Sequence, residues 1–214
     1  MNGVLCLLTL VGVCLTGAAC DTLYYKTMKK FGLEKRDILV KRVRDAQKSQ
    51  TEAKEEFQTA LERFRTVIEV DGGPLEKKYE TLARALERSE DKARQVRERI
   101  GAVRDVSDDL FKEWQKELGN YSDRRLRAES ERELRETKRR ADALITAMTR
   151  AEARIAPVLK PLQDRVLFLK HNLNAAAIAS LQTTAKGIES DVERLVAEMN
   201  ASIAEADRFI KGMK

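Results

Sequence analysis

The stretch LVKRVRDAQKSQTEAKEEFQTALERFRTVIEVDGGP, residues 39–74, decides the fold of this chain. In alternating steps of four and three from Leu39 to Val67, every position except Gln50 is Ala, Val, Leu or Phe. Such spacing is typical of a helix that packs along its length against other helices. The run then meets residues 71–74, where glycine can adopt positive φ and proline can open the next helix. We therefore expect a long helix, a tight reversal and a second helix that runs back.

Three more apolar stripes follow with the same spacing, and two further turn signals separate them, at residues 119–123 and 171–174. Pro157 and Pro161 lie inside the third stripe. Because each removes a backbone donor and clashes with the preceding turn, we expect a kink or a short break there. The sequence predicts helices at roughly 34–70, 75–118, 124–170 and 174–211.

The composition suits long charged helices better than a thick globular core. Charged residues make up 36% of the 214 and aromatic residues 5%, with Gly 10 and Pro 3. We expect an all-α protein, an elongated antiparallel helical bundle or coiled coil of about four long helices after a signal segment. The expected parts are a lipoprotein-type signal peptide over 1–19, a lipidated, basic membrane-proximal segment over 20–33 and one bundle domain over 34–214.

The apolar run VLCLLTLVGVCLTGAA, residues 4–19, indicates an export signal. A bilayer crossing needs about 20 residues, whereas the apolar part of a secretory signal has about 7 to 15, followed by small residues at the cut. The small residues here end at Ala19, and Cys20 would become the new N-terminus. All three cysteines, Cys6, Cys14 and Cys20, lie in the first 20 residues, so no disulfide framework or thiolate metal site can form downstream.

This arrangement resembles a bacterial lipobox, in which the chain is cut between Ala19 and Cys20 and the Cys sulfur and amine are acylated. The sequence departs from that pattern at Gly17, where Leu is usual, and in its uncharged start, residues 1–3. Two alternatives are ordinary cleavage after Ala19 and an uncleaved anchor. Asp21 resembles a signal that retains lipoproteins in the inner membrane, but it can equally be a solvated acid. Inner and outer membrane therefore both stay open.

A basic segment follows the proposed anchor. Its cations are Lys26, Lys29, Lys30, Lys35 and Arg36. Anionic headgroups could attract each of them by about 1 kcal/mol. Tyr24, Met28 and Phe31, spaced by four and three, would form the apolar side of a short helix. We expect membrane contact here, with packing on the bundle as the alternative.

Several stretches together resemble a bacterial family known as domain of unknown function 2959. They are KRDILVKRV (35–43), DGGPLEKKY (71–79), LFKEWQKEL (110–118), SERELRETKRR (130–140) and LKHNLNAAAIASL (169–181). The resemblance covers nearly everything after Cys20. It implies an exported, helical, often lipoprotein-like protein and brings no assigned activity.

The polar cluster His171, Asn172 and Asn174 stands at a predicted helix junction. It could act as a proton switch or partner contact, but we expect these side chains to satisfy backbone groups at helix ends. A lone His without acidic or thiol neighbours at ligand spacing is a poor metal site. No phosphate loop, nucleophile elbow or carboxylate pair stands out. We therefore predict no enzyme activity, no catalytic residues, no metal and no cofactor.

These features favour a non-enzymatic, lipid-anchored and periplasm-facing protein of the bacterial envelope that acts as a helical scaffold or interaction module. The expected partners are membrane lipid, through the acyl chains, and an unknown envelope protein, with homo-oligomers as a further option. The alternative is a curvature-binding coiled coil, which would dimerise and use one continuous basic face. Its cations would be Arg124, Arg125, Arg127, Arg139 and Arg140. Nucleic acid is not expected, despite the net charge of +6, because interleaved aromatics are missing and export conflicts with it.

Overall fold

The computed structural model of the protein describes residues 35–69, 74–172 and 174–213. The described residues form helices and no strand, which confirms the all-α prediction. The elements are α2 (Lys35–Glu69), α3 (Leu75–Glu117), a short 3-10 helix η1 (Leu118–Asn120), α4 (Arg124–Ala153), α5 (Ile155–His171) and α6 (Ala175–Gly212).

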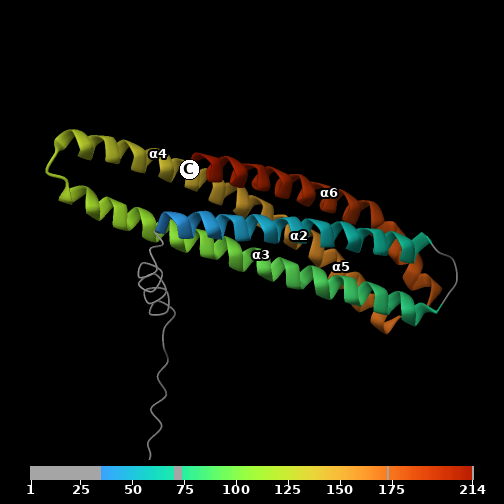
Figure 1. Ribbon diagram of the computed structural model, residues 1–214. Coiled ribbons are helices and arrows are strands. Elements are labelled where there is room, and N and C mark those ends of the chain that lie inside the picture. The colour runs from blue at the N-terminus through green and yellow to red at the C-terminus, as the bar shows by residue number, and fades with distance from the viewer. Residues whose placement is uncertain (1–34, 70–73, 173, 214) are drawn as a thin grey trace, which may run out of the picture.

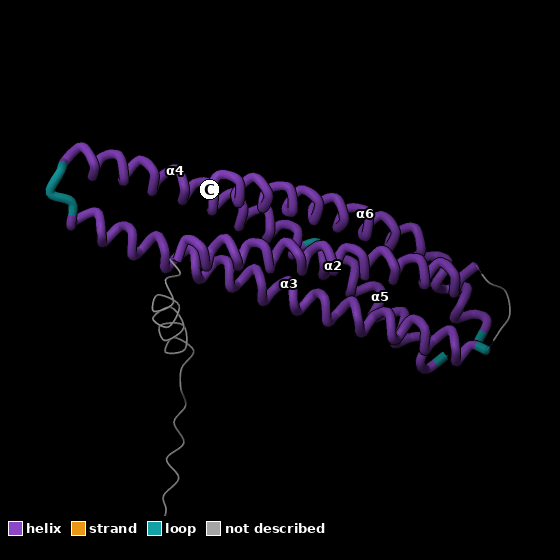
Figure 2. The backbone as a smooth tube through the Cα atoms, viewed as in Figure 1, coloured by secondary structure: helices purple, strands orange, loops and turns teal. Residues whose placement is uncertain are grey.

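The helices form an up-and-down four-helix bundle in which α4 and α5 together make one column (Figures 1 and 2). Helix α2 packs on α3 and on α6, and the α4–α5 column closes the bundle by packing on the same two helices. Since each of the four columns runs antiparallel to the one before it, columns that follow one another in the sequence lie side by side. The molecule is a rod, as the long stripes predict.

The core of the rod follows the predicted apolar stripes. Phe57 and Phe64 are buried on α2, with 0% and 1% of their surface exposed. Alanines such as Ala46, Ala53 and Ala141 are also buried and allow the helices to approach closely. Full burial of a side chain the size of Phe contributes about 1.5 to 3 kcal/mol. The stripe therefore supplies both the contact surface and most of the driving force for packing.

The helix predicted over 124–170 is in fact two helices, which join at Arg154. Arg154 has φ −79° and ψ −11°, and its N–H donates to the Ala151 carbonyl at 3.2 Å, one residue short of the α-helical partner. The cause is Pro157, which has no N–H for the Ala153 carbonyl and whose ring crowds that carbonyl. The expected break is thus present, three residues ahead of the proline. Pro161 lies inside α5, which continues past it.

Among the described residues, α3, η1 and α4 form one end of the rod. Lys35 Nζ lies 3.0 Å from Glu113 Oε2, and Arg36 donates to the Met213 carbonyl, so α2 begins and α6 ends level with Glu113. Beyond that level the chain continues through residues 114–136, which we call the projecting hairpin (Figure 1). Asp123 caps its second helix, because Oδ1 accepts from the Arg125 N–H at 2.7 Å.

Candidate functional site

The proposed anchor residues Ala19, Cys20 and Asp21, together with Lys26, Lys29 and Lys30, lie outside the described residues. Lipid attachment, signal cleavage and sorting at these positions therefore stay predictions.

The two described members of the basic segment contact the bundle itself. Lys35 pairs with Glu113, and Arg36 donates from Nε and Nη2 to the Met213 carbonyl at 3.1 and 2.7 Å. That carbonyl follows the last residue of α6, where the helix carries partial negative charge, so a guanidinium is stabilising there. Membrane contact by these two residues stays a prediction. In the structure Lys35 joins the start of the bundle to α3, and Arg36 joins it to the C-terminal end.

The predicted polar turn lies at the other end of the rod. His171 is the exposed last residue of α5, and Asn172 Nδ2 donates to the Phe168 carbonyl at 3.0 Å. The Asn174 N–H donates to the Asn172 carbonyl at 2.8 Å. The Phe168 carbonyl is one of the groups that a helix end leaves without an intrahelical partner. At least Asn172 therefore has a structural role at this helix end.

Beside this turn α5 exposes two large apolar side chains that the sequence prediction did not single out. Leu167 is 58% exposed and Phe168 43% exposed, whereas the neighbouring Leu169 is fully buried. The signal was in the sequence: Leu167 and Phe168 fall outside the stripe that contains Leu162 and Leu169. Apolar residues off the core stripe of a helix are candidates for contact with a partner.

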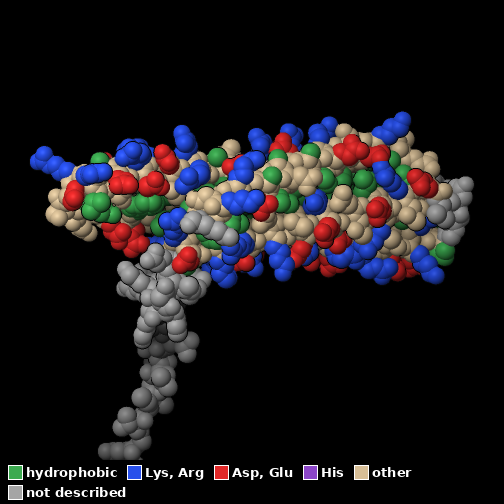
Figure 3. All heavy atoms as spheres, turned by 45° about the horizontal axis from the view of Figure 1, so that its top comes forward, with side chains coloured by type: hydrophobic (Ala, Val, Ile, Leu, Met, Phe, Trp, Pro, Cys, Tyr) green, Lys and Arg blue, Asp and Glu red, His purple; other side chains and the backbone are tan. Residues whose placement is uncertain are grey.

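The projecting hairpin has an apolar inner face. Trp114 on α3 is half-buried, and its indole N–H donates to Ser130 Oγ on α4 at 2.9 Å. Leu126 stands four residues before Ser130, so it lies on the same face of α4, and it is 52% exposed. Tyr121 in the connecting loop is 42% exposed. Figure 3 shows hydrophobic side chains open to the surface at this end of the molecule, between acidic and basic ones.

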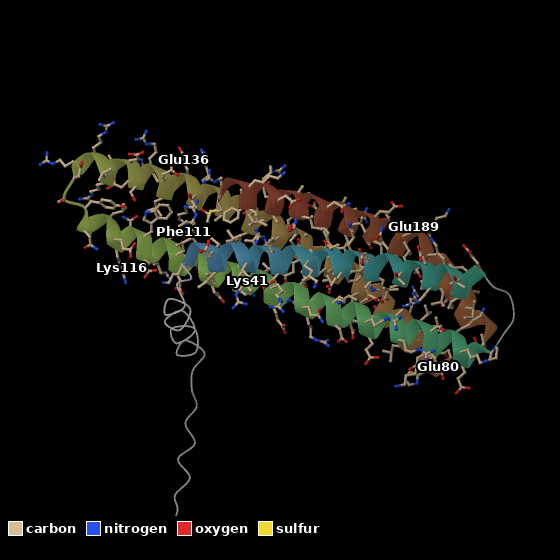
Figure 4. All side chains as sticks on the ribbon, in the orientation of Figure 1. Lys41, Glu80, Phe111, Lys116, Glu136 and Glu189 are labelled. Carbon is tan, nitrogen blue, oxygen red and sulfur yellow. The ribbon has the colours of Figure 1, made fainter. Side chains whose placement is uncertain are left out.

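A cavity of about 190 Å³ lies where the hairpin leaves the bundle. Its lining combines apolar and charged side chains: Arg36, Leu110, Glu113, Trp114, Glu117 and Met213. Phe111, also on this part of α3, is buried and has Lys138 Nζ 5.7 Å from its ring centroid (Figure 4 labels Phe111). The cavity is thus a half-open, partly acidic pocket at the rim of the bundle.

The arginines of the proposed basic face have different surroundings. Arg124, Arg125, Arg127 and Arg139 are exposed, and Arg127 also pairs with Glu131 at 3.0 Å. Arg140 lies against Gly212 and donates to Thr137 Oγ1 at 3.1 Å. Acidic residues such as Glu131 therefore lie among the exposed arginines, and Arg140 packs against α6.

The core contains one polar pair that connects α2 with α6. Ser202 Oγ donates to Gln50 Oε1 at 2.9 Å, and both residues are fully buried. Gln50 Nε2 has no acceptor among the described residues. A buried polar pair disfavours other registers of the two helices, because a shift would leave both groups unsatisfied.

Among the described residues, the bundle lowers the pKa of Glu52. The Lys92 ammonium donates a hydrogen bond to the Glu52 carboxylate at 2.7 Å and, with Lys48, lowers the pKa of that carboxyl, while partial burial opposes the shift. The pair joins α2 to α3 on the flank of the rod. The lowered pKa is what an ion pair between two helices produces.

No described helix has a stretch both long and apolar enough to span a membrane. Within the same residues no three His, Cys, Asp or Glu side chains are grouped to hold a metal ion.

A family profile described as "Protein of unknown function (DUF2959)" matches residues 24–213. The chain belongs to this family. The DUF2959 match takes in the whole bundle and also residues 24–34, which come before α2. No curated protein and no solved structure matches the chain. The family assignment confirms the resemblance and carries no activity with it.

Proposed function

We propose that this DUF2959 protein is a non-enzymatic helical scaffold of the bacterial envelope, held at a membrane by acyl chains on Cys20. The apolar run of residues 4–19, the small residues before Cys20 and the cysteine itself support the anchor. Two or more acyl chains are needed for stable anchoring, since a single chain binds only marginally. The bundle that follows would face the periplasm.

The observation that carries the scaffold role is the exposed pair Leu167 and Phe168 at the far end of the rod. The chain enters the bundle at Lys35, level with the rim that contains Glu113 and Met213. With its 35 residues α2 extends about 52 Å from there at 1.5 Å per residue. A tether at the near end would therefore hold the apolar pair about one length of α2 away from the rim, where it can meet a partner.

The fitting partner is another envelope protein with an apolar recess of its own. Leu167 and Phe168 together offer an aliphatic and an aromatic side chain, the kind of residues that fill pockets at protein interfaces. The neighbouring Lys170 and His171 are exposed and would lie at the polar rim of such a contact.

Site-specific photocrosslinking in living cells tests this role. A photoreactive phenylalanine in place of Phe168 should give a discrete crosslinked species, and Leu167→Asp should abolish it. The same amino acid in place of exposed Arg139, on α4, is the matched control and should give none. A species of twice the chain mass would identify a homo-oligomer as the partner. Equal or absent crosslinking at both positions would contradict the proposal.

Curvature binding is the second candidate, because α4 carries exposed arginines, among them Arg124, Arg125 and Arg139. It requires a dimer and tubulation of anionic vesicles by the purified protein. A monomer in sedimentation that leaves vesicles round would exclude it. The scaffold proposal predicts that the vesicles stay round, whether the protein is a monomer or a dimer.

A further inference from the structure

The inner face of the projecting hairpin continues the core of the bundle beyond the helices that cover it. On α4 the residues Leu134, Thr137 and Ala141 are buried, and two steps of four lead back from Leu134 to Ser130 and Leu126. Yet Leu126 is 52% exposed. The reason is length: within the described residues α2 and α6 stop level with Glu113, so the hairpin has core-facing positions that neither of these two helices covers (Figure 1).

The cavity at the rim marks where a missing element would begin. Its apolar wall is made by Leu110, Trp114 and Met213, and its charged wall by Glu113, Glu117 and Arg36. Glu113 pairs with Lys35 and Arg36 donates to the Met213 carbonyl, so Glu117 is the charge left for an occupant to meet. Figure 4 places Phe111 and Lys116 on this part of α3, with Glu136 on the facing helix. An occupant should therefore combine an apolar side with positive charge.

One segment of this chain has that character and starts at the rim. Residues 24–33, YYKTMKKFGL, carry Tyr24, Met28 and Phe31 at helical spacing. The same ten residues contain three lysines and no acid. Their sign is opposite to that of Glu113 and Glu117. Lys35, which follows the segment after one intervening acid, Glu34, already pairs with Glu113.

The connection is also short enough. Phe31 stands four residues before Lys35, and a fully extended chain spans at most about 3.6 Å per residue, so the Cα atoms of Phe31 and Lys35 are at most about 14 Å apart. The DUF2959 match begins at residue 24, so it takes in this segment as well as the bundle. Both facts favour a segment that belongs to the folded domain.

We propose that residues 24–33 dock on the inner face of the projecting hairpin. Tyr24, Met28 and Phe31 cover Trp114 and Leu126, and the lysines lie beside Glu113 and Glu117. The docked segment completes the core at this end and joins whatever precedes it directly to the rod. The inference does not depend on acylation of Cys20.

Trp114 reports on the docking because it is the single tryptophan of the chain. In the full-length protein in lipid nanodiscs, Met28→Ser with Phe31→Ser should raise acrylamide quenching of Trp114 about twofold and shift its emission to longer wavelength. Tyr25→Ser, off the apolar stripe, is the matched control and should leave both unchanged. Unchanged circular dichroism would show that the double variant keeps its helices. Equal quenching in all three proteins would overturn the proposal.

A photoreactive phenylalanine in place of Phe31 provides the second test. We expect an intramolecular crosslink that mass spectrometry maps to residues 110–126, and none from the same amino acid at Tyr25. A crosslink to lipid, or quenching of Trp114 by brominated lipids, would show that a membrane covers this face instead. A product of twice the chain mass would show that a second copy covers it. Either of these two results would refute docking of the segment.

Discussion

The buried pair Gln50 and Ser202 gives the sharpest prediction about the bundle. Ser202→Ala removes the one hydrogen bond that the Gln50 side chain makes among the described residues. The amide would then be buried with neither its oxygen nor its nitrogen paired. An unsatisfied buried polar group costs about 1 to 3 kcal/mol, so we expect the free energy of unfolding to fall by about 2 kcal/mol.

Gln50→Leu, in contrast, should leave the free energy of unfolding nearly unchanged or raise it. It removes the amide and its unpaired nitrogen, and it leaves the Ser202 hydroxyl free to donate to a carbonyl one turn earlier in α6. Ser89 already makes such a bond in α3, to the Ala85 carbonyl at 3.0 Å. Since replacing buried polar groups by apolar ones is often neutral or stabilising, we expect Gln50→Leu to stay within about 1 kcal/mol of the parent or above it. Ser202→Ala in that background should then cost much less than in the parent.

Urea unfolding followed by circular dichroism measures all four proteins of this double-mutant cycle. Ser89→Ala is the control, because its hydroxyl only returns to its own helix and its loss should matter little. The reasoning would fail if Ser202→Ala lay within about 0.3 kcal/mol of the parent, or if its cost were the same with Leu at position 50.

Three further predictions address the core, the ion pair and the helix break. Phe57→Ala, at a fully buried position, should lower the free energy of unfolding by about 3 to 5 kcal/mol in urea, and exposed Arg139→Ala should not. Because the pKa of Glu52 is lowered by Lys92, its stabilising effect is complete above the ordinary glutamate pKa of about 4.3 and is lost as pH falls through the lowered value. Glu52→Gln should therefore flatten the acid side of a plot of melting temperature against pH, and an unaltered plot would count against the pair. Pro157→Ala restores a donor for the Ala153 carbonyl, so hydrogen exchange at residues 154–158 should slow as α4 and α5 merge, and faster exchange would refute this cause of the break.

Much of the fold could be predicted from the sequence because its signals are local. The stripe from Leu39 to Val67 and the glycines before Pro74 suffice for a helical hairpin, since each acts within a few residues. The position of the helix break was harder to predict. Pro157 acts on the carbonyl four residues earlier, so the helix ends before the proline, at a residue that has no special preference itself.

The contacts between distant segments could not be predicted in the same way. Gln50 looked like an interruption of the stripe, and only the register of α2 against α6 shows that it meets Ser202. Leu126 follows the apolar spacing, but its exposure depends on where α2 begins and α6 ends. The sequence predicted helices of unequal length, yet the projecting hairpin follows from how their ends align in space.

Intact mass spectrometry of the mature protein from the membrane fraction tests the anchored scaffold most directly. The proposal predicts a chain that begins at Cys20, heavier than its amino-acid sequence by a diacylglycerol and a further acyl group. Cys20→Ser should remove that mass and release the protein from the membrane. A mature chain with an unmodified thiol at Cys20, or one that keeps residues 1–19, would contradict the anchor.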